Sequence, residues 1–243
     1  MAIYFVSDFH LGEGDREKEQ LKVDRFHQFL EATTGDMEHL VILGDMFEFW
    51  FEYRHLIPKK NLHLLFELHD LVRRGVRVSY IAGNHDYWMD DFLQRELGIE
   101  MCRDKLEIAT QRGAILAMHG DGLAKSDWLY RRLKAILRSR TSIALYRLLP
   151  PSLAYALAYR MARRSRQHTD KHLPERFLNQ YRDYARERLA EGYFAFICGH
   201  THRPEISRIG ECYYLNSGDW FDNFSYIRFD GREFELHYLP TDS

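Results

Sequence analysis

Five short polar motifs constrain the fold of this chain, because each of them directly follows a short apolar run. The runs are rich in β-branched or aromatic residues and end at turn residues, which is typical of buried strands. Helical periodicity separates the first three runs, since residues 21–32 and 62–73 each place their apolar side chains on one stripe. This alternation predicts an α/β architecture. The five predicted strands span residues 3–7, 39–43, 76–82, 114–119 and 194–198.

The C-terminal end has a different pattern, in which short apolar runs follow one another without helices between them. Short turns join the runs, and two of these turns contain Ile209-Gly210 and Asp230-Gly231. Such turns are typical of antiparallel hairpins. We therefore expect a single domain, residues 1–243, in which two sheets pack face to face as a sandwich flanked by helices. The four predicted C-terminal strands span residues 206–209, 211–216, 224–229 and 234–238.

Residues 125–190 differ from the rest of the chain in charge and in texture. They are helical by composition and are interrupted by Pro150-Pro151 and by Pro174. This segment holds 16 Lys and Arg against 5 Asp and Glu, whereas the remaining residues hold 18 basic and 31 acidic side chains. We predict a basic helical insertion, or lid, on an acidic body.

The five motifs are rich in carboxylate, amide and imidazole side chains. Loops at the carboxyl ends of strands in an α/β sheet converge to form a site, so the motifs are expected to meet. In an extended chain residues i and i+2 point the same way, which predicts that Asp8 faces the same cavity as His10, and His200 the same cavity as His202. The motifs are Asp8-Phe9-His10, Gly44-Asp45, Gly83-Asn84-His85-Asp86, His119-Gly120-Asp121 and Gly199-His200-Thr201-His202.

This set of donors indicates a metal centre. Asp, Asn and His suit Mn, Fe, Zn or Co, and no cysteine belongs to the set. A closed structural zinc site has four ligands and usually includes thiolates, so the set is too large and too rich in oxygen for one. Seven ligands with one bridging carboxylate fit two ions about 3.5–4 Å apart, as in two-metal phosphoryl chemistry. We predict a two-metal phosphoesterase.

The series D-x-H, GD, GNHD, HGD and GHTH resembles the calcineurin-like metallophosphoesterases over nearly the whole chain. The resemblance implies two divalent ions, of which Mn²⁺ is the expected identity, and Asp45 as the ligand that bridges them. It also implies that His85 contacts the phosphate or protonates the leaving oxygen, beside Asn84 and Asp45. The implied ligands of one ion are Asp8, His10, Asp45 and His202, and those of the other are Asp45, Asn84, His119 and His200.

A finer resemblance points to the UDP-2,3-diacylglucosamine hydrolases of lipid A synthesis. It rests on residues 44–50, on residues 199–204, and on His119-Gly120-Asp121 followed by Asp127 and Tyr130. The resemblance implies attack of water on the α-phosphate of the UDP group, which gives UMP and 2,3-diacylglucosamine 1-phosphate. One position departs from the group, because its best-known members have Arg where this chain has His85.

The resemblance further implies that the insertion caps the site and receives the acyl chains. Clustered guanidiniums suit a diphosphate, which needs positive charge beyond that of the metals. The substrate-binding residues expected on these grounds are Asp127, Tyr130, Arg163, Arg164, Ser165, Thr169 and His172.

The alternation of apolar and basic residues in the insertion predicts peripheral contact with an anionic membrane surface. The chain begins without a basic leader and has no apolar run of 18 residues, so we expect a protein of the cytoplasm at the inner membrane. Three alternatives stay open: a phosphodiesterase or phosphatase for a nucleotide or another lipid head group, a non-catalytic scaffold, and a nucleic-acid clamp. Nothing in the sequence predicts the oligomeric state.

Overall fold

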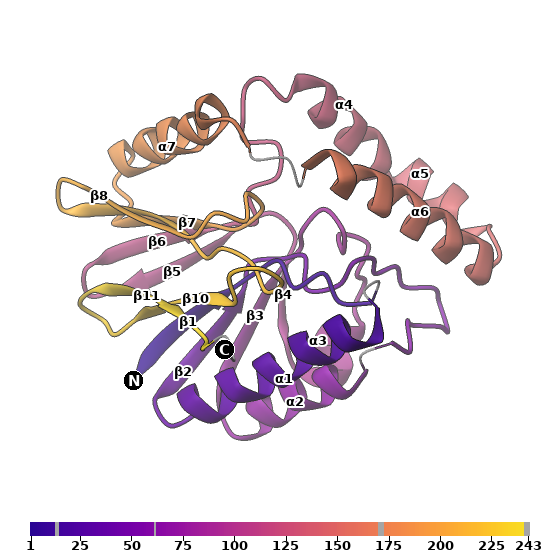
Figure 1. Cartoon of the computed structure of the whole chain (residues 1–243), viewed down its shortest axis with the longest axis horizontal. Coiled ribbons are helices and arrows are strands. Elements are labelled where there is room, and N and C mark those ends of the chain that lie inside the picture. Colours follow the sequence, from indigo (N-terminus) through magenta and orange to yellow (C-terminus); the bar gives the residue numbers. More distant parts are fainter. Residues whose placement is uncertain (13–14, 61, 170–172, 241–243) are drawn as a thin grey trace.

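The computed structural model describes residues 1–12, 15–60, 62–169 and 173–240, and for residues 162–169 it describes the backbone alone. Two β-sheets pack face to face, and helices cover the outer face of each sheet (Figure 1). The predicted α/β sandwich flanked by helices is therefore confirmed.

The first sheet has six strands in the order β11-β10-β1-β2-β3-β4, and β1, β2, β3 and β4 run parallel to one another. The second sheet has five strands in the order β5-β6-β7-β9-β8, in which β6, β7 and β9 run parallel. The strands of the first sheet are β1 (Ala2–Val6), β2 (Met37–Ile42), β3 (Arg77–Ile81), β4 (Glu100–Cys102), β10 (Ser225–Phe229) and β11 (Phe234–Tyr238). The strands of the second are β5 (Leu106–Thr110), β6 (Gly113–Ala117), β7 (Ala195–Cys198), β8 (Glu205–Ile209) and β9 (Cys212–Asn216).

The C-terminal hairpins are present as predicted, but they belong to different sheets. β8 pairs with β9 in the five-stranded sheet, and β10 pairs with β11 in the six-stranded sheet. The loop between β9 and β10 crosses from one sheet to the other and buries Trp220 and Phe224. The short strands β4 and β5 were not predicted from the sequence, because they are brief and sit between stronger helix and strand patterns.

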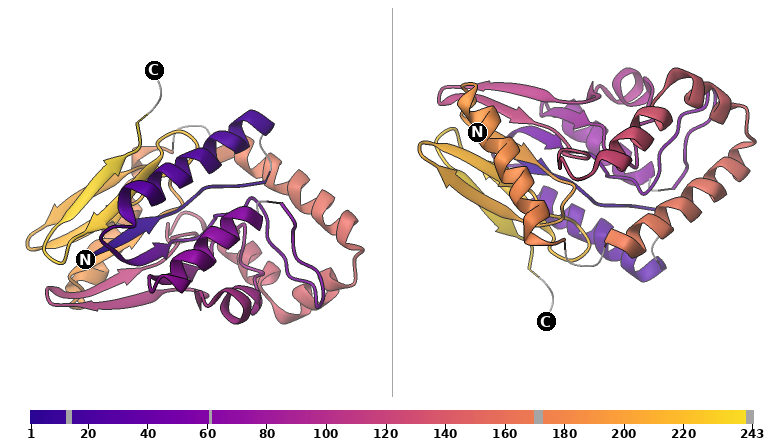
Figure 2. Two further views of the ribbon diagram at one scale, coloured as in Figure 1. Left: turned by 90° about the horizontal axis from the view of Figure 1, so that it is seen from below. Right: turned by 90° about the horizontal axis from the view of Figure 1, so that it is seen from above.

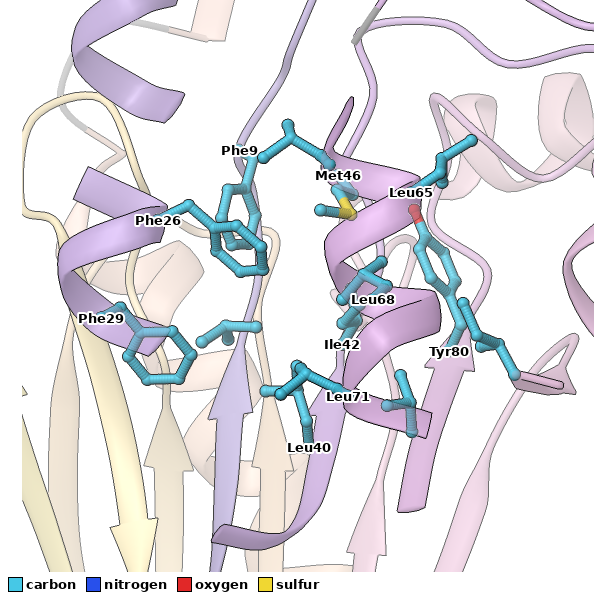
Figure 3. Close-up of a cluster of buried hydrophobic side chains, with 14 of the residues drawn as sticks. Phe9, Phe26, Phe29, Leu40, Ile42, Met46, Leu65, Leu68, Leu71 and Tyr80 are labelled. Atoms are coloured by element: carbon cyan, nitrogen blue, oxygen red, sulfur yellow. The ribbon is translucent and has the colours of Figure 1, made fainter. Parts of the chain in front are cut away.

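Three helices cover the outer face of the six-stranded sheet: α1 (Arg16–Thr33), α2 (Leu62–Arg73) and α3 (Phe92–Leu97). Asp15 begins α1 as its N-cap, because its side chain accepts a hydrogen bond from the Lys18 backbone N–H at 3.0 Å. Burial of the apolar stripe of each helix against the sheet holds this layer together. Figure 3 shows Phe26 and Phe29 of α1 and Leu65, Leu68 and Leu71 of α2 facing Leu40, Ile42 and Tyr80 of the sheet.

The insertion divides into two parts that pack differently. Helix α7 (Glu175–Ala190) lies along the five-stranded sheet, against which it buries Tyr181, Ala185 and Leu189. Helices α4 (Trp128–Leu137), α5 (Arg140–Arg147) and α6 (Pro151–Thr169) stand beside the sandwich instead (Figures 1 and 2). We call residues 125–169 the cap and the rest of the described chain the body. No helix of the described residues is long and apolar enough to cross a membrane.

Candidate metal centre and substrate pocket

The five motifs converge at one edge of the sandwich, where the parallel strands of both sheets end. Backbone hydrogen bonds join the loops of different strands to one another. The Asp8 N–H donates to the Gly44 carbonyl at 3.1 Å, and the Gly199 N–H donates to the His119 carbonyl at 2.9 Å. The Trp220 N–H donates to the Asp8 carbonyl at 3.1 Å, so the loop after β9 is tied in as well. The convergence that the strand ends predicted is therefore present.

The backbone of these loops is left-handed at the predicted ligands. Six non-glycine residues of the described chain have a positive φ, and five of them are predicted ligands. Asp8 and His10 were expected to share a cavity because an extended chain points them the same way. The stated reason is wrong, because the chain is not extended at either residue. Left-handed residues turn the chain sharply, and such strained conformations gather at functional sites. The five values of φ are 56° at Asp8, 49° at His10, 52° at Asp45, 65° at His200 and 55° at His202.

Two glycines allow the loops to approach the carboxylates closely. A Cβ at Gly83 would lie 2.1 Å from Asp45 Oδ1, and a Cβ at Gly199 would lie 2.5 Å from Asp8 Oδ2. Neither distance is compatible with a side chain, so only glycine fits at these positions.

Asp8, His10 and His202 form the first group of donors, and their ligand atoms lie within 4.8 Å of one another. Asp8 Oδ1 is 3.2 Å from His202 Nε2 and 3.7 Å from His10 Nε2. The other carboxylate oxygen, Oδ2, accepts hydrogen bonds from the Ser7 hydroxyl and from the His200 N–H. One oxygen of Asp8 is thus held by the protein, while the other faces two imidazoles.

Asp45, His119 and His200 form the second group, again within 4.8 Å. Asp45 Oδ1 accepts the His85 N–H at 2.8 Å, whereas Oδ2 lies 3.4 Å from His119 Nε2 and 3.9 Å from His10 Nε2. Asp45 Oδ2 therefore lies between the two groups, at the position predicted for a bridging ligand. His119 Nδ1 donates to the Leu43 carbonyl at 2.7 Å, which leaves Nε2 for ligation next to Asn84 Oδ1 at 3.0 Å.

The donor set fits divalent ions. Among the described residues, no hydrogen-bond partner satisfies the buried atoms Asp8 Oδ1, Asp45 Oδ2 and His10 Nε2. Buried polar atoms are normally satisfied, and a group of converging acceptors is satisfied by a cation. Burial lowers the pKa of His10 to about 3 and that of His200 to about 4, so both are in the neutral form that binds metal. Burial by itself lowers the pKa of His119, but the nearby Asp45 carboxylate outweighs it and raises the pKa to about 10, so a metal ion bound there would displace a proton from His119.

Glu48 belongs to this centre, although it was not singled out from the sequence. Its carboxylate is fully buried and lies 3.3 Å from His10 Nδ1 and 4.0 Å from His85 Nδ1. His85 Nδ1 also donates to the Glu48 carbonyl at 2.8 Å. These contacts orient both imidazoles and turn the Nε2 atom of each toward Asp45. Glu48 stands three residues after Asp45, and a carboxylate so close to a predicted ligand is the sequence feature that could have indicated its place in the centre.

A pocket of about 280 Å³ adjoins the centre and lies between the body and the cap. One part of its lining is polar, with Asn84 and His85 from the body and Tyr130, Lys134 and Arg138 from the cap. The remaining lining is mostly apolar or aromatic and comes both from loops of the body and from the cap helices α4, α5 and α6 (Figure 1). The main apolar side chains are Phe49, Phe51 and Trp88 from the body and Leu133, Leu157 and Met161 from the cap.

Asp121 is the point at which the cap is fastened to the body. Its buried carboxylate accepts hydrogen bonds from the Tyr130 hydroxyl at 3.1 Å and from Arg138 at 3.0 Å, and it pairs with Lys134 at 2.8 Å. All three partners come from α4 or from Arg138 at its C-terminal end. Asp121 was part of a recognised motif, but its role as a fastening point cannot be read from the sequence.

The predicted substrate-binding residues have different outcomes. Tyr130 lines the pocket, and Asp127 lies at the N-terminal end of α4 outside the lining that the described residues form. Arg163, Arg164, Ser165 and Thr169 lie on α6, where the side chains are outside the described residues, and His172 lies outside them altogether. The ligand and substrate-binding roles of these and of the seven metal-site residues stay predictions.

The sequence profile of the calcineurin-like phosphoesterases matches residues 1–204, and the chain belongs to this family. The family makes it a metal-dependent phosphoester hydrolase, and the Asp and His groups described above are its candidate metal ligands.

Relatives that match over most of the chain point to one activity within the family. The UDP-2,3-diacylglucosamine hydrolase of Porphyromonas gingivalis is 30% identical over 94% of both chains. The hydrolase of the same name from Azotobacter vinelandii is 29% identical over all of both chains. An archaeal phosphodiesterase of known structure has a TM-score of 0.53 at 13% identity, covering 98% of this chain and 100% of the other, and this likeness supports the fold alone.

Proposed function

We propose that this chain cleaves the diphosphate of UDP-2,3-diacylglucosamine to UMP and 2,3-diacylglucosamine 1-phosphate, as a step of lipid A synthesis. The observation that carries the proposal is the pocket beside the metal centre. A pocket with a cationic end and an apolar remainder fits a ligand with an anionic head and an apolar tail. The full-length relatives bearing this hydrolase name support the same choice.

The residues of the centre divide the chemical work. Two divalent ions, which we propose to be Mn²⁺, would when bound hold the phosphate oxygens, activate the attacking water and offset the charge of the transition state. Asp45 would help to hold both ions, since its Oδ2 faces both groups of donors while its Oδ1 accepts the His85 N–H. His85 Nε2 lies 3.9 Å from Asp45 Oδ2, which places it to contact the phosphate or to protonate the leaving oxygen.

The apolar part of the pocket suits the acyl chains. Phe49 packs its ring against Trp88, Tyr146 and Tyr155 at centroid distances of 5.4–6.1 Å. Body and cap thus share one aromatic wall, and an acyl chain lying along it would replace water contacts with apolar ones.

The direct test is hydrolysis of UDP-2,3-diacylglucosamine with added Mn²⁺, read as release of UMP. Bis-p-nitrophenyl phosphate serves as a generic diester in parallel. Rapid release of UMP is the expected result. Turnover of the diester without release of UMP would retain the phosphoesterase centre and reject the lipid substrate in favour of a nucleotide or another head group.

We further propose that the cap rests on an anionic membrane surface. Large apolar side chains of α4, of α5 and of the residue that follows α5 are exposed, among them Leu129 at 66%, Leu145 at 62% and Leu148 at 79%. Basic residues such as Arg131 and Arg132 stand beside them, and this pairing suits insertion between anionic head groups.

Sedimentation with vesicles tests this contact. Vesicles that contain phosphatidylglycerol should carry the wild type down at low salt, and less so at high salt because screening weakens the attraction. Changing both Leu145 and Leu148 to Ser should reduce the sedimented fraction. Wild-type protein that stays in the supernatant at low salt would contradict the proposal.

A further inference from the structure

Two positively charged side chains line the pocket, and neither of them is needed to hold the metal ions. Among the described residues, its Lys and Arg lining consists of Lys134 and Arg138, both in the cap. They share one carboxylate, that of Asp121, so a positive charge remains at this end of the pocket. The Lys134 and Arg138 side chains are only 25% and 12% exposed. Burying two cations beside one carboxylate costs free energy unless a further anion binds next to them.

Arg138 is held in a fixed position. Its Nη2 donates to Asp121 Oδ2 at 3.0 Å and to the Gly83 carbonyl at 3.1 Å. Its guanidinium carbon lies 3.9 Å from the centroid of the Tyr87 ring. Gly83 directly precedes Asn84 and His85, so the same contacts place the guanidinium next to the predicted phosphate-binding residues. A guanidinium has five donors, and the two recorded contacts use only Nη2.

We propose that Arg138, assisted by Lys134, binds the β-phosphate of the substrate and stabilises its departure. This inference rests on the proposed function. It assigns to Arg138 the β-phosphate, which leaves when the bond to the α-phosphate is cleaved at the metal centre. Arg is the side chain best suited to this task, because its planar fork matches the geometry of phosphate oxygens.

The chemistry of the leaving group explains the need for a cation. The water oxygen forms a bond to the α-phosphorus, and the water gives up a proton to the solvent. The bond from the α-phosphorus to the bridging oxygen then breaks, and its electron pair leaves on the β-phosphate. A phosphomonoester has a second pKa of about 6, so at neutral pH the free product is a dianion, whether or not His85 lends the bridging oxygen a proton while the bond breaks. Positive charge aimed at the departing oxygens therefore lowers the barrier.

The test compares two substrates in the metal-loaded enzyme. Arg138→Gln should lower kcat/KM on UDP-2,3-diacylglucosamine by about a hundredfold, as loss of one charge-stabilising donor does. On bis-p-nitrophenyl phosphate, which has no β-phosphate, the loss should stay below about threefold. Arg138→Lys keeps the charge without the fork and should fall between the two. Equal losses on both substrates would assign Arg138 a structural role and overturn the proposal.

Arg147→Gln provides the matched control. Arg147 also joins the cap to the body, through Asp90 at 2.8 Å, but it does not line the pocket. Arg147→Gln should leave unchanged the ratio of the activity on UDP-2,3-diacylglucosamine to the activity on bis-p-nitrophenyl phosphate. A wild type that releases no UMP would reject the proposed function itself, which is a different result from an unchanged ratio in Arg138→Gln.

Binding without metal supplies a second readout. Calorimetry should show 2,3-diacylglucosamine 1-phosphate binding to Arg138→Gln at least about tenfold more weakly than to the wild type. Binding of 2,3-diacylglucosamine without its phosphate should be unchanged. Equal binding of the phosphate-bearing lipid by both proteins would overturn the proposal, as would equal weakening for the two lipids.

Discussion

The body and the cap of this protein use similar residues in opposite ways. In the body, leucines such as Leu40 and Leu68 are fully buried between a sheet and its covering helices. In the cap, α4 and α5 bury no residue at all, although both are rich in large apolar side chains. The body therefore supplies stability and positions the predicted metal ligands, whereas the cap leaves apolar surface exposed. Apolar composition alone does not tell these roles apart.

The largest expected effect comes from the body. Asp45→Asn should lower kcat/KM by about a thousandfold, or about 4 kcal/mol of activation free energy, because it removes the charge of the bridging carboxylate. Bound metal, measured by mass spectrometry, should fall as well. Asp70→Asn, on an exposed face of α2, is the matched control and should change neither quantity. Near-native activity of Asp45→Asn would refute the two-metal assignment.

A pair of leucine variants addresses the contrast itself. Leu40→Ala removes a fully buried side chain from the core and should lower the free energy of unfolding by about 2–5 kcal/mol. Leu148→Ala, at a side chain that is 79% exposed, should change it by no more than about 0.5 kcal/mol. Urea unfolding measures both. Similar losses in the two variants would mean that the cap contributes to the core after all.

Glycine variants sharpen the account of the body. Gly83→Ala places a methyl group 2.5 Å from the Asp45 backbone nitrogen and should cost about 1–3 kcal/mol of stability, together with much of the metal affinity. Gly35→Ala meets nothing within 4 Å and should be neutral or slightly stabilising. Thermal unfolding and metal titration of both proteins check this. Full metal affinity in Gly83→Ala would show that the loops are looser than their contacts indicate.

The smallest effect is expected where the two regions meet in solvent. The Arg147 and Asp90 side chains pair at 2.8 Å but are 45% and 52% exposed. Exposed pairs of this kind contribute about 0.2–1 kcal/mol. Removing the pair with Arg147→Gln should lower the unfolding free energy by no more than that, and salt should mask the difference. A loss of several kcal/mol would show instead that the pair between Arg147 and Asp90 is a main contact holding the cap to the body.

Much of the fold was predictable, because buried parallel strands and amphipathic helices leave clear periodic patterns. The positions of the five motifs at strand ends followed directly from those patterns. The C-terminal hairpins were predicted as pairs, but not their division between two sheets. That division depends on the loop after β9, which is anchored by Trp220 and by its N–H bond to Asp8. Such a long-range contact leaves no local pattern.

The site was predictable in its residue types but not in its geometry. Left-handed backbone at His10 or Asp45 is imposed by tertiary contacts, such as the bond from the His10 N–H to the Asp45 carbonyl. Glu48 and Asp121 act through burial and through partners that are distant in the sequence. The division of residues 125–190 into cap and α7 was hidden for a similar reason. Both parts are amphipathic helices, and the sheet beneath α7 is what buries its apolar stripe.

The joining of loops from both sheets has a consequence for the order of events during synthesis. The ribosome makes Asp8 192 residues before it makes His200, whose N–H the Asp8 carboxylate binds. At about 5–20 residues per second, the ribosome needs roughly 10–40 s to span that interval. The first three strands and their helices emerge early and can bury their shared core during this time. The centre that would hold the ions is completed only after the loop that follows β7 has emerged, so until then the nascent chain offers no finished site in which a wrong metal would be trapped.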